Sequence, residues 1–159
     1  MEKNGRHYVG IGEAEIITGE GVMRTILGSC VGLIVYDTTI PVGGMAHIML
    51  PEPVLGKTTW SRFASTVVPR LTQELEKYGA QLKRMKAIVT GGASMFAFLS
   101  GRSNGIGAIG SRNTHVVIEE LRKIGIPIVK KDIGGTSGRK VEFDIGVGEC
   151  RISLMKKAL

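Results

Sequence analysis

One cysteine and one histidine in this chain have the types and spacing for nucleophilic chemistry. Cys30 lies in LGSCVGLIVYD (27–37), between a Gly-Ser step and an apolar run that predicts a buried strand. A thiol attacks as the thiolate, and its ordinary pKa of about 8.5 means that a catalytic cysteine needs a nearby base or a positive field. Histidine is the usual base, and the chain has three, at positions 7, 47 and 115.

His47 is singled out by a predicted hairpin. If CVGLIVYD and IPVGGMAHIML pair antiparallel across a two-residue loop, Thr38-Thr39, then Cys30 lies directly opposite His47. Opposed residues share one face of the sheet, with Cβ atoms roughly 4.5 to 5.5 Å apart, so thiol and imidazole would be within reach of each other. A three-residue loop would instead send the two side chains to opposite faces.

The backbone before the cysteine is a candidate oxyanion site. Gly28 and Ser29 permit close approach, and the amides around Ser29 and Cys30 could donate to a developing oxyanion. The structural alternative is strong for both side chains. A free cysteine beside an apolar strand usually only packs, and a histidine within such a strand is commonly a hydrogen-bonded core residue. Cys150 has no histidine at a comparable spacing and is predicted to lie in the core.

Two glycine-rich stretches carry weaker signals. GIGAIG (105–110) has the spacing of a dinucleotide fingerprint, but no strand directly precedes it, so a loop that caps the following helix is preferred. GGAS (91–94) follows a buried strand and predicts a tight turn, whose amides could also bind an anion or a carbonyl oxygen. No His, Cys or carboxylate cluster has metal-ligand spacing, so neither a metal nor another cofactor is expected.

Length and composition indicate one globular domain. The 159 residues suffice for a single core, and 43% are hydrophobic and 22% charged. No apolar run reaches the roughly 18 residues of a membrane helix and no secretory signal is visible, so we expect a cytoplasmic protein without membrane insertion. The net charge of +7 comes from scattered groups without interleaved aromatic residues. This disfavours nucleic-acid binding and leaves a solvated basic surface or attraction to an acidic protein partner.

Hydrophobic patterns predict the elements that must position these residues. Extended segments are expected over 8–17, 23–27, 30–36, 45–50, 86–90, 126–132, 139–146 and 149–155. One helix is expected from Ser61, as its N-cap, to Gly79, kinked or split at Pro69, and a second over 111–125. The predicted fold class is α/β (α+β), with mixed, mostly antiparallel sheet layers and about two packed helices in a single domain, 1–159.

Five segments, in the same order, resemble the CheD family of chemoreceptor glutamine deamidases. They are LGSC (27–30), MAHIMLP (45–51), GGASMF (91–96), IGSRN (109–113) and DIGGTSGRKVEF (132–143). The resemblance implies a hydrolase of bacterial chemotaxis adaptation, a protein-glutamine glutaminase that converts receptor glutamine side chains to glutamate and releases ammonia. It implies a Cys-His thioester mechanism with Cys30 as the nucleophile and His47 as the base.

The family is described as orienting its histidine with a threonine upstream of the cysteine. Thr25 is the obvious candidate here, but the counterpart could also fall at Arg24, which cannot accept a hydrogen bond from an imidazole. The partners that the resemblance implies are the cytoplasmic helical bundles of chemoreceptors and a CheC-type phosphatase. The alternative function is a non-catalytic docking module that binds receptors and this phosphatase.

Overall fold

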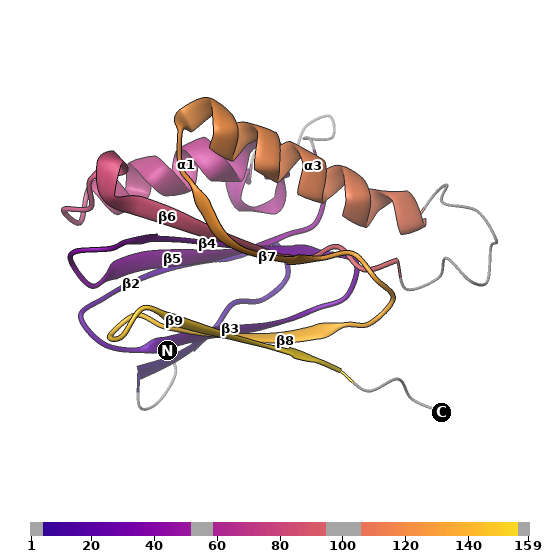
Figure 1. The fold of residues 1–159 in the computed structure, drawn as a ribbon, viewed down its shortest axis with the longest axis horizontal. Coiled ribbons are helices and arrows are strands. Elements are labelled where there is room, and N and C mark those ends of the chain that lie inside the picture. Colours follow the sequence, from indigo (N-terminus) through magenta and orange to yellow (C-terminus); the bar gives the residue numbers. More distant parts are fainter. Residues whose placement is uncertain (1–4, 52–58, 95–105, 156–159) are drawn as a thin grey trace.

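The computed structural model describes residues 5–51, 59–94 and 106–155, which form two β-sheets and two α-helices (Figure 1). The strands of these ranges are β1 (Arg6–Tyr8), β2 (Ala14–Thr18), β3 (Val22–Leu27), β4 (Val31–Asp37), β5 (Val42–Ile48), β6 (Met85–Gly91), β7 (Ile128–Ile133), β8 (Arg139–Asp144) and β9 (Glu149–Leu154). The helices are α1 (Ala64–Glu76) and α3 (Ile106–Ile124), with short 3-10 turns η2 (Trp60–Arg62) and η3 (Leu82–Arg84). Within the described ranges, no helix is long and apolar enough to cross a membrane.

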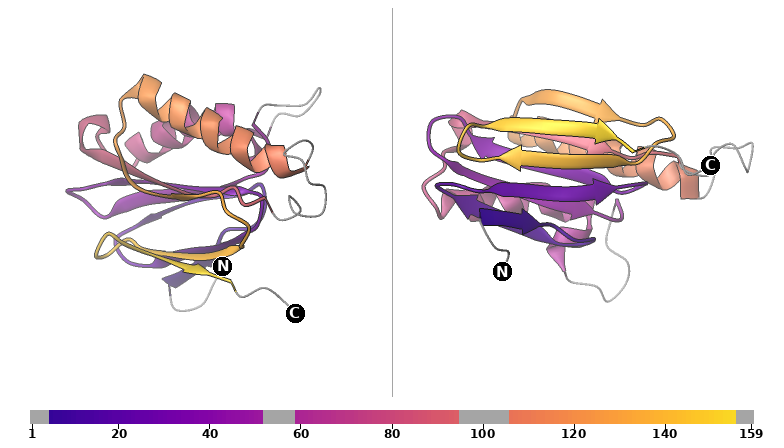
Figure 2. Two further views of the ribbon diagram at one scale, coloured as in Figure 1. Left: turned by 45° about the vertical axis from the view of Figure 1, so that its right-hand side comes forward. Right: turned by 90° about the horizontal axis from the view of Figure 1, so that it is seen from below.

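The strands form two sheets that pack face to face. One sheet has the order β1-β3-β8-β9, and the other has the order β2-β5-β4-β6-β7. Neighbouring strands are antiparallel except for the pairs β1–β3 and β6–β7. The helices cover the outer face of the five-stranded sheet, and the four-stranded sheet covers its inner face, which gives three layers (Figures 1 and 2). The predicted α+β class, with mostly antiparallel sheet layers and two packed helices, is confirmed.

The central strands of the five-stranded sheet, β5, β4 and β6, are buried on both faces. In β4, Leu33 packs under the helices, whereas Ile34 packs between the two sheets. Because successive side chains alternate in direction, a strand covered on both sides needs a continuous apolar run, which is what its sequence has. In β5, a Cβ at Gly44 would lie 2.8 Å from Leu71 Cδ1 of α1, so the glycine lets the helix approach the strand closely.

The first helix starts later than predicted. Ser61 is not its N-cap, because its hydroxyl donates a hydrogen bond to the Gly12 carbonyl at 2.7 Å and Phe63 takes the cap position. The helix runs through Pro69 without interruption, so it is not split there. It ends shortly before Gly79, whose φ of +95° is of the kind that favours glycine.

The second helix starts earlier than predicted. It begins at Ile106, so the described part of GIGAIG (106–110) is helical and the expected loop is wrong. A Cβ at Gly110 would lie 2.7 Å from the Gly92 carbonyl oxygen, so a glycine at this position lets the helix pack directly on the backbone that follows β6. The helix ends just before Gly125 (φ +88°), as predicted.

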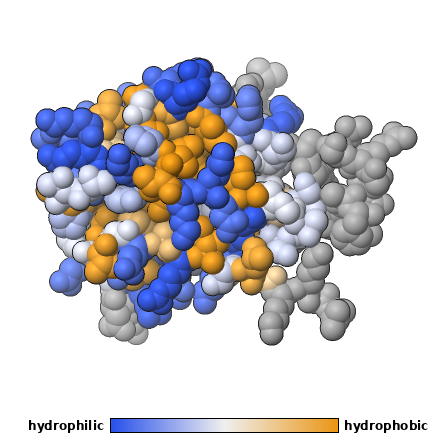
Figure 3. All heavy atoms as spheres, in the orientation of Figure 1, coloured by the Kyte–Doolittle hydropathy of each residue, from blue (hydrophilic) through white to orange (hydrophobic). Residues whose placement is uncertain are grey.

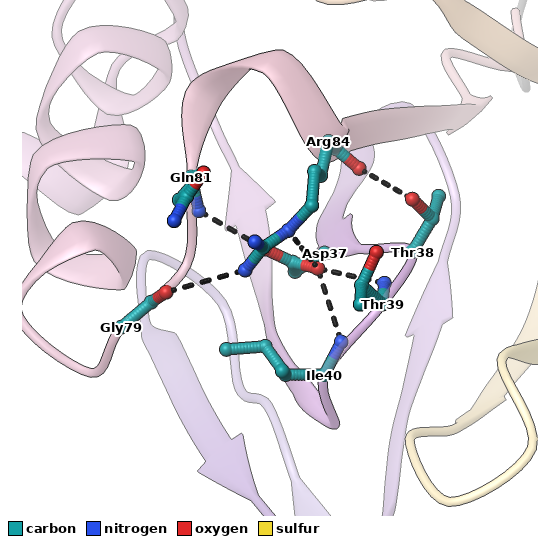
Figure 4. Close-up of polar contacts among 7 residues, drawn as sticks. All are labelled: Asp37, Thr38, Thr39, Ile40, Gly79, Gln81 and Arg84. Carbon is teal, nitrogen blue, oxygen red and sulfur yellow. Dashed lines mark hydrogen bonds and ion pairs between the residues drawn. The ribbon is translucent and has the colours of Figure 1, made fainter.

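The turn between β4 and β5 is longer than predicted and is built around Asp37. Its carboxylate accepts hydrogen bonds from the amides of Thr39 at 2.7 Å and Ile40 at 3.1 Å, and from the guanidinium of Arg84 (Figure 4). Residues 38–41 therefore connect the strands, and the predicted two-residue loop is wrong.

This turn sets the register of the hairpin. Gly32, rather than Cys30, lies opposite His47. The predicted direct pairing of Cys30 with His47 is therefore wrong by two residues. Because the side-chain period of a strand is two, a shift of two residues leaves Cys30 and His47 on the same face of the sheet.

Candidate functional site

His47 and Thr25 join the two sheets through their side chains. His47 lies in β5 and Thr25 in β3, and each residue is 1% exposed. Thr25 Oγ1 is 2.8 Å from His47 Nδ1 and 2.7 Å from the carbonyl oxygen of Val9. The structure thus brings together two of the residues that the sequence nominated, from two different layers.

These two contacts fix the tautomer of His47. A threonine hydroxyl has one proton, and the Val9 carbonyl can only accept a hydrogen bond, so the Thr25 proton points to Val9. Thr25 Oγ1 must then accept from His47 Nδ1–H. The lone pair of the neutral imidazole is therefore on Nε2, where it can take up a proton.

Cys30 lies in the bend that joins β3 to β4, one residue before β4 begins. It is half-buried, and its side chain packs against the hydrophobic cluster between the sheets. Its carbonyl accepts a hydrogen bond from the Gly92 amide at 2.9 Å, which extends the β4–β6 pairing by one residue. Cys30 is two residues from Gly32, so it is a diagonal neighbour of His47 across the β4–β5 pair.

The Gly28–Cys30 bend is held by the backbone that follows β6. The Ala93 amide donates to the Gly28 carbonyl at 3.1 Å. Gly91 has φ +99°, and a Cβ there would lie 2.4 Å from the Cys30 carbonyl oxygen, so only glycine fits. Among the hydrogen bonds of the described residues, none is donated by the amides of Gly28, Ser29 or Cys30. The bend is thus anchored by its carbonyls while its amides remain available.

Arg139 braces the same region from the other sheet. It is 4% exposed, lies opposite Leu27 in the β3–β8 pair, and donates to the Gly134 carbonyl at 2.9 Å and the Gly91 carbonyl at 3.4 Å. It also forms an ion pair with Asp132 at 3.3 Å. Because Gly91 abuts the cysteine bend, this side chain ties the turn after β7 to the candidate site.

Burial sets the protonation of both candidate reactive groups. It raises the pKa of the Cys30 thiol. Burial also lowers the pKa of His47. The nearby Val9 carbonyl and Glu13 carboxylate raise this pKa, but by less than burial lowers it. At neutral pH the resting pair is therefore a neutral thiol and a neutral imidazole rather than an ion pair.

The structure separates Thr25 from the alternative Arg24. Side chains alternate along β3, so Thr25 faces the five-stranded sheet and Arg24 the opposite side, where its pairing partners are Tyr8 and Glu142. Cys150 is half-buried against the cluster between the sheets, and its pKa is raised to about 11 by burial.

Sequence reasoning missed Arg139 and Thr90, which is fully buried in β6 directly before GGAS. Both are polar residues on a face whose other inward positions are apolar, Val141 and Phe143 in β8 and Ile88 in β6. That exception to the alternating pattern is the signal that could have found them. Within the described ranges, no group of three His, Cys, Asp or Glu side chains could hold a metal ion.

Hollows lie at both ends of the sandwich. A hollow of about 310 Å³ adjoins the GGAS turn, and Ser94, Ser111 and His115 are among its lining residues. Two others, of about 500 and 640 Å³, lie at the far end around Glu20 and Gly146. Only the first is next to the backbone that holds Cys30.

Comparisons with known proteins place the chain in a family. The family model described as CheD chemotactic sensory transduction matches residues 49–154. A chemoreceptor glutamine deamidase CheD of Halalkalibacterium halodurans is 42% identical over 140 residues, covering 86% of this chain and 85% of that protein. One of Thermotoga maritima is 41% identical over 146 residues, covering 91% and 88%.

A solved structure shows a similar fold. The hypothetical protein YfiH of Bacillus licheniformis matches with a TM-score of 0.50 and 13% identity, over 82% of this chain and 60% of that chain. At this identity the likeness concerns the fold alone. The family model and the sequence relatives, taken together, establish that this chain belongs to the CheD family.

Proposed function

We propose that residues 1–159 act as one protein-glutamine glutaminase domain that converts glutamine side chains of chemoreceptors to glutamate. The names of its relatives support a glutamine deamidase. The observation that carries the proposal is the Thr25–His47 contact, because it leaves an imidazole lone pair free on Nε2 in a family of amide hydrolases.

The first half of the reaction forms a thioester. His47 Nε2 takes the proton of the Cys30 thiol as the sulfur attacks the glutamine Cδ, and the carbonyl becomes an oxyanion. The imidazolium then gives this proton to the amide nitrogen, and ammonia leaves. Thr25 accepts from Nδ1–H throughout, so it holds the ring in orientation while Nε2 gains and loses the proton.

The second half hydrolyses the thioester. Neutral His47 takes a proton from water as the water attacks the thioester carbon, and the proton passes to the departing sulfur of Cys30. The free amides of the Gly28–Cys30 bend, including that of Ser29, stabilise the oxyanion in both halves. The product is an anionic glutamate in place of a neutral glutamine.

The receptor partner is the cytoplasmic helical bundle, and a CheC-type phosphatase is a second partner. The hollow beside the GGAS turn is next to the Cys30 bend, and we assign it to contacts with the receptor segment that flanks the glutamine. The net charge of +7 favours an acidic partner. Receptor binding should therefore weaken as salt is raised, and a Kd independent of salt would argue against this electrostatic contribution.

The experiment is the mass of a receptor cytoplasmic fragment after incubation with the protein. Each conversion replaces an amide NH2 with OH and adds slightly to the mass, while ammonia is released in step. We expect conversion by the wild type and none by Cys30→Ala. Cys150→Ala is the matched control, because Cys150 is also half-buried against the same cluster, and it should remain active.

The alternative docking module predicts a different result. If the protein binds the receptor fragment but the mass of the fragment does not increase, the protein is such a module, and Cys30 is a packing residue. If Cys30→Ala still converts glutamine, the protein is a deamidase, but Cys30 is not its nucleophile.

A further inference from the structure

Thr90 is a buried polar residue whose hydroxyl has no hydrogen-bond partner. It lies in β6 and is 0% exposed, and its Oγ1 is unpaired. A buried hydroxyl without a bond costs free energy, because it has given up its bonds to water. Valine has nearly the same shape and would avoid this cost, so the hydroxyl calls for a functional explanation.

Thr90 and His47 flank one glycine. Thr90 lies opposite Gly32 in the β4–β6 pair, and His47 lies opposite the same Gly32 in the β4–β5 pair. The Thr90 methyl is 3.5 Å from the point where a Gly32 Cβ would lie, and Leu27 Cδ1 of β3 is 2.9 Å from that point. The row His47–Gly32–Thr90 therefore crosses three strands on the face between the sheets, and Leu27 covers it.

Cys30 lies at the same diagonal position relative to His47 and to Thr90. It precedes Gly32 by two positions, and its side chain packs on the same inner cluster. Its carbonyl bonds to the Gly92 amide, two positions beyond Thr90. Cys30 is thus a diagonal neighbour of His47 on one side and of Thr90 on the other, at a Cα separation of about 7–8 Å and a smaller Cβ separation.

We infer that Thr90 is a positioning residue that donates its hydroxyl hydrogen bond to the Cys30 sulfur when the thiol transfers its proton to His47. This inference rests on the proposed function. The thiol proton moves from Sγ to His47 Nε2, and Thr90 keeps its own proton and only donates a hydrogen bond.

The difference between thiol and thiolate explains why the hydroxyl is unpaired at rest. A neutral thiol sulfur is a weak acceptor, whereas a thiolate accepts strongly. A donor that engages only the thiolate stabilises the charged form and lowers the barrier to attack. It also opposes the effect of burial, which raises the pKa of Cys30.

The other buried groups of the site region are already engaged. Asn113 donates to the Met49 carbonyl at 3.0 Å, and the Arg139 guanidinium donates to the Gly134 carbonyl. Each has one further unpaired atom, but its side chain is already anchored. The Thr90 hydroxyl has no bond in the resting structure, so its proton has no competing acceptor there.

The test compares Thr90→Val with Thr90→Ser in a Cys150→Ala background, so that Cys30 is the only thiol. The measurements are kcat and KM on a receptor cytoplasmic fragment, the pH midpoint of Cys30 alkylation by iodoacetamide, and Tm. For Thr90→Val we expect Tm unchanged or higher, kcat about tenfold lower, KM unchanged, and an alkylation midpoint about one pH unit higher. Thr90→Ser restores the donor and should retain most of the activity.

Thr72→Val is the matched control. Thr72 is also buried, but its hydroxyl donates to the Val68 carbonyl at 2.8 Å, so its loss should lower Tm and leave kcat unchanged. If Thr90→Val does not fold, Thr90→Ala provides the same comparison with a smaller side chain. Wild-type kcat and alkylation midpoint in the folded variant would overturn the inference.

Cys30→Ala distinguishes a failure of the inference about Thr90 from a failure of the proposed function. If it is inactive while Thr90→Val keeps full activity, the inference about Thr90 is wrong and the proposed function stands. If Cys30→Ala is itself active, both the thioester mechanism and the inference about Thr90 are wrong.

Discussion

The two ends of β4 treat buried polar groups in opposite ways. At the C-terminal end of β4, the carboxylate of Asp37 is fully hydrogen-bonded. Both of its oxygens accept hydrogen bonds from Arg84, and it also accepts from the amides of Thr39, Ile40 and Gln81 (Figure 4). Burial alone would raise the pKa of Asp37, but these hydrogen bonds outweigh it and hold the pKa well below its usual range.

At the start of β4, polar groups are left unsatisfied. Thr90 Oγ1 and Arg139 Nε are buried without a partner, and the pKa of Cys30 is raised by burial with no opposing charge. The contrast suggests a division of labour along one strand. The Asp37 end stabilises the fold, and under the proposed function the Cys30 end gives up stability for groups that act when a substrate binds.

The largest effect should come from His47→Gln. Removing the base should lower the rate of deamidation by about 100- to 10,000-fold, the usual contribution of a positioned general base. Circular dichroism should show an intact fold, and the mass assay gives the rate. If the variant keeps more than a tenth of the activity, the contrast between the two ends of β4 fails, because the N-terminal end near His47 is then not the reactive one.

Asp37→Ala should have the opposite effect. It leaves Arg84 and three backbone amides without their acceptor, so urea denaturation should show a loss of about 2–4 kcal/mol. Activity per folded molecule should stay near that of the wild type. If Asp37→Ala is stable but inactive, a change at the C-terminal end of β4 affects the activity at its N-terminal end, and the two ends are coupled.

Gly91→Ala should damage the cysteine bend. Its Cβ would collide with the Cys30 carbonyl oxygen, so we expect a 10- to 100-fold loss of activity, about 1.4–2.7 kcal/mol in the barrier. Gly148→Ala is the control, because Gly148 also has a positive φ (+69°) but nothing lies within 4 Å of its Cβ position. If both variants lose the same activity, the cause is backbone strain at a positive φ rather than displacement of the Cys30 bend.

The smallest effect is a separation of activity and stability in pH. His47 must be neutral to act, and its lowered pKa puts the acid limb of kcat/KM below about pH 6.5. The contribution of Asp37 to stability is complete above about pH 3.9 and is lost only as pH falls through its lowered pKa. Activity should therefore fall at a higher pH than the fold does; coincident midpoints, by circular dichroism and the mass assay, would contradict this.

The apolar runs predicted the central strands β4 and β6, because a strand buried on both faces needs an uninterrupted apolar sequence. The single strand predicted over 8–17 is wrong, since residues 9–13 lie outside any strand and separate β1 from β2. The register of the hairpin was not predictable, since Asp37 organises its turn together with Arg84, 47 residues away in sequence. Tertiary contacts of this kind leave no local pattern.

The candidate site was only partly accessible from the sequence. Cys30 and His47 were found by residue type and by resemblance, and Thr25 was one of two options. Thr90 was missed because its relevance depends on two separate strand pairings that meet at Gly32. Surface chemistry offered little guidance, since hydrophilic and hydrophobic residues are interspersed on the face seen in Figure 3.

The Thr25–His47 contact also has a consequence for biosynthesis. His47 belongs to a sheet whose neighbouring strands β4 and β5 are adjacent in sequence, but β3, which carries Thr25, is held in its own sheet between β1 and β8. Because β8 (139–144) is the next neighbour of β3 in that sheet, the sheet can be completed only after most of the chain has been made. We therefore expect the Thr25–His47 contact to form late in synthesis, once both sheets are in place.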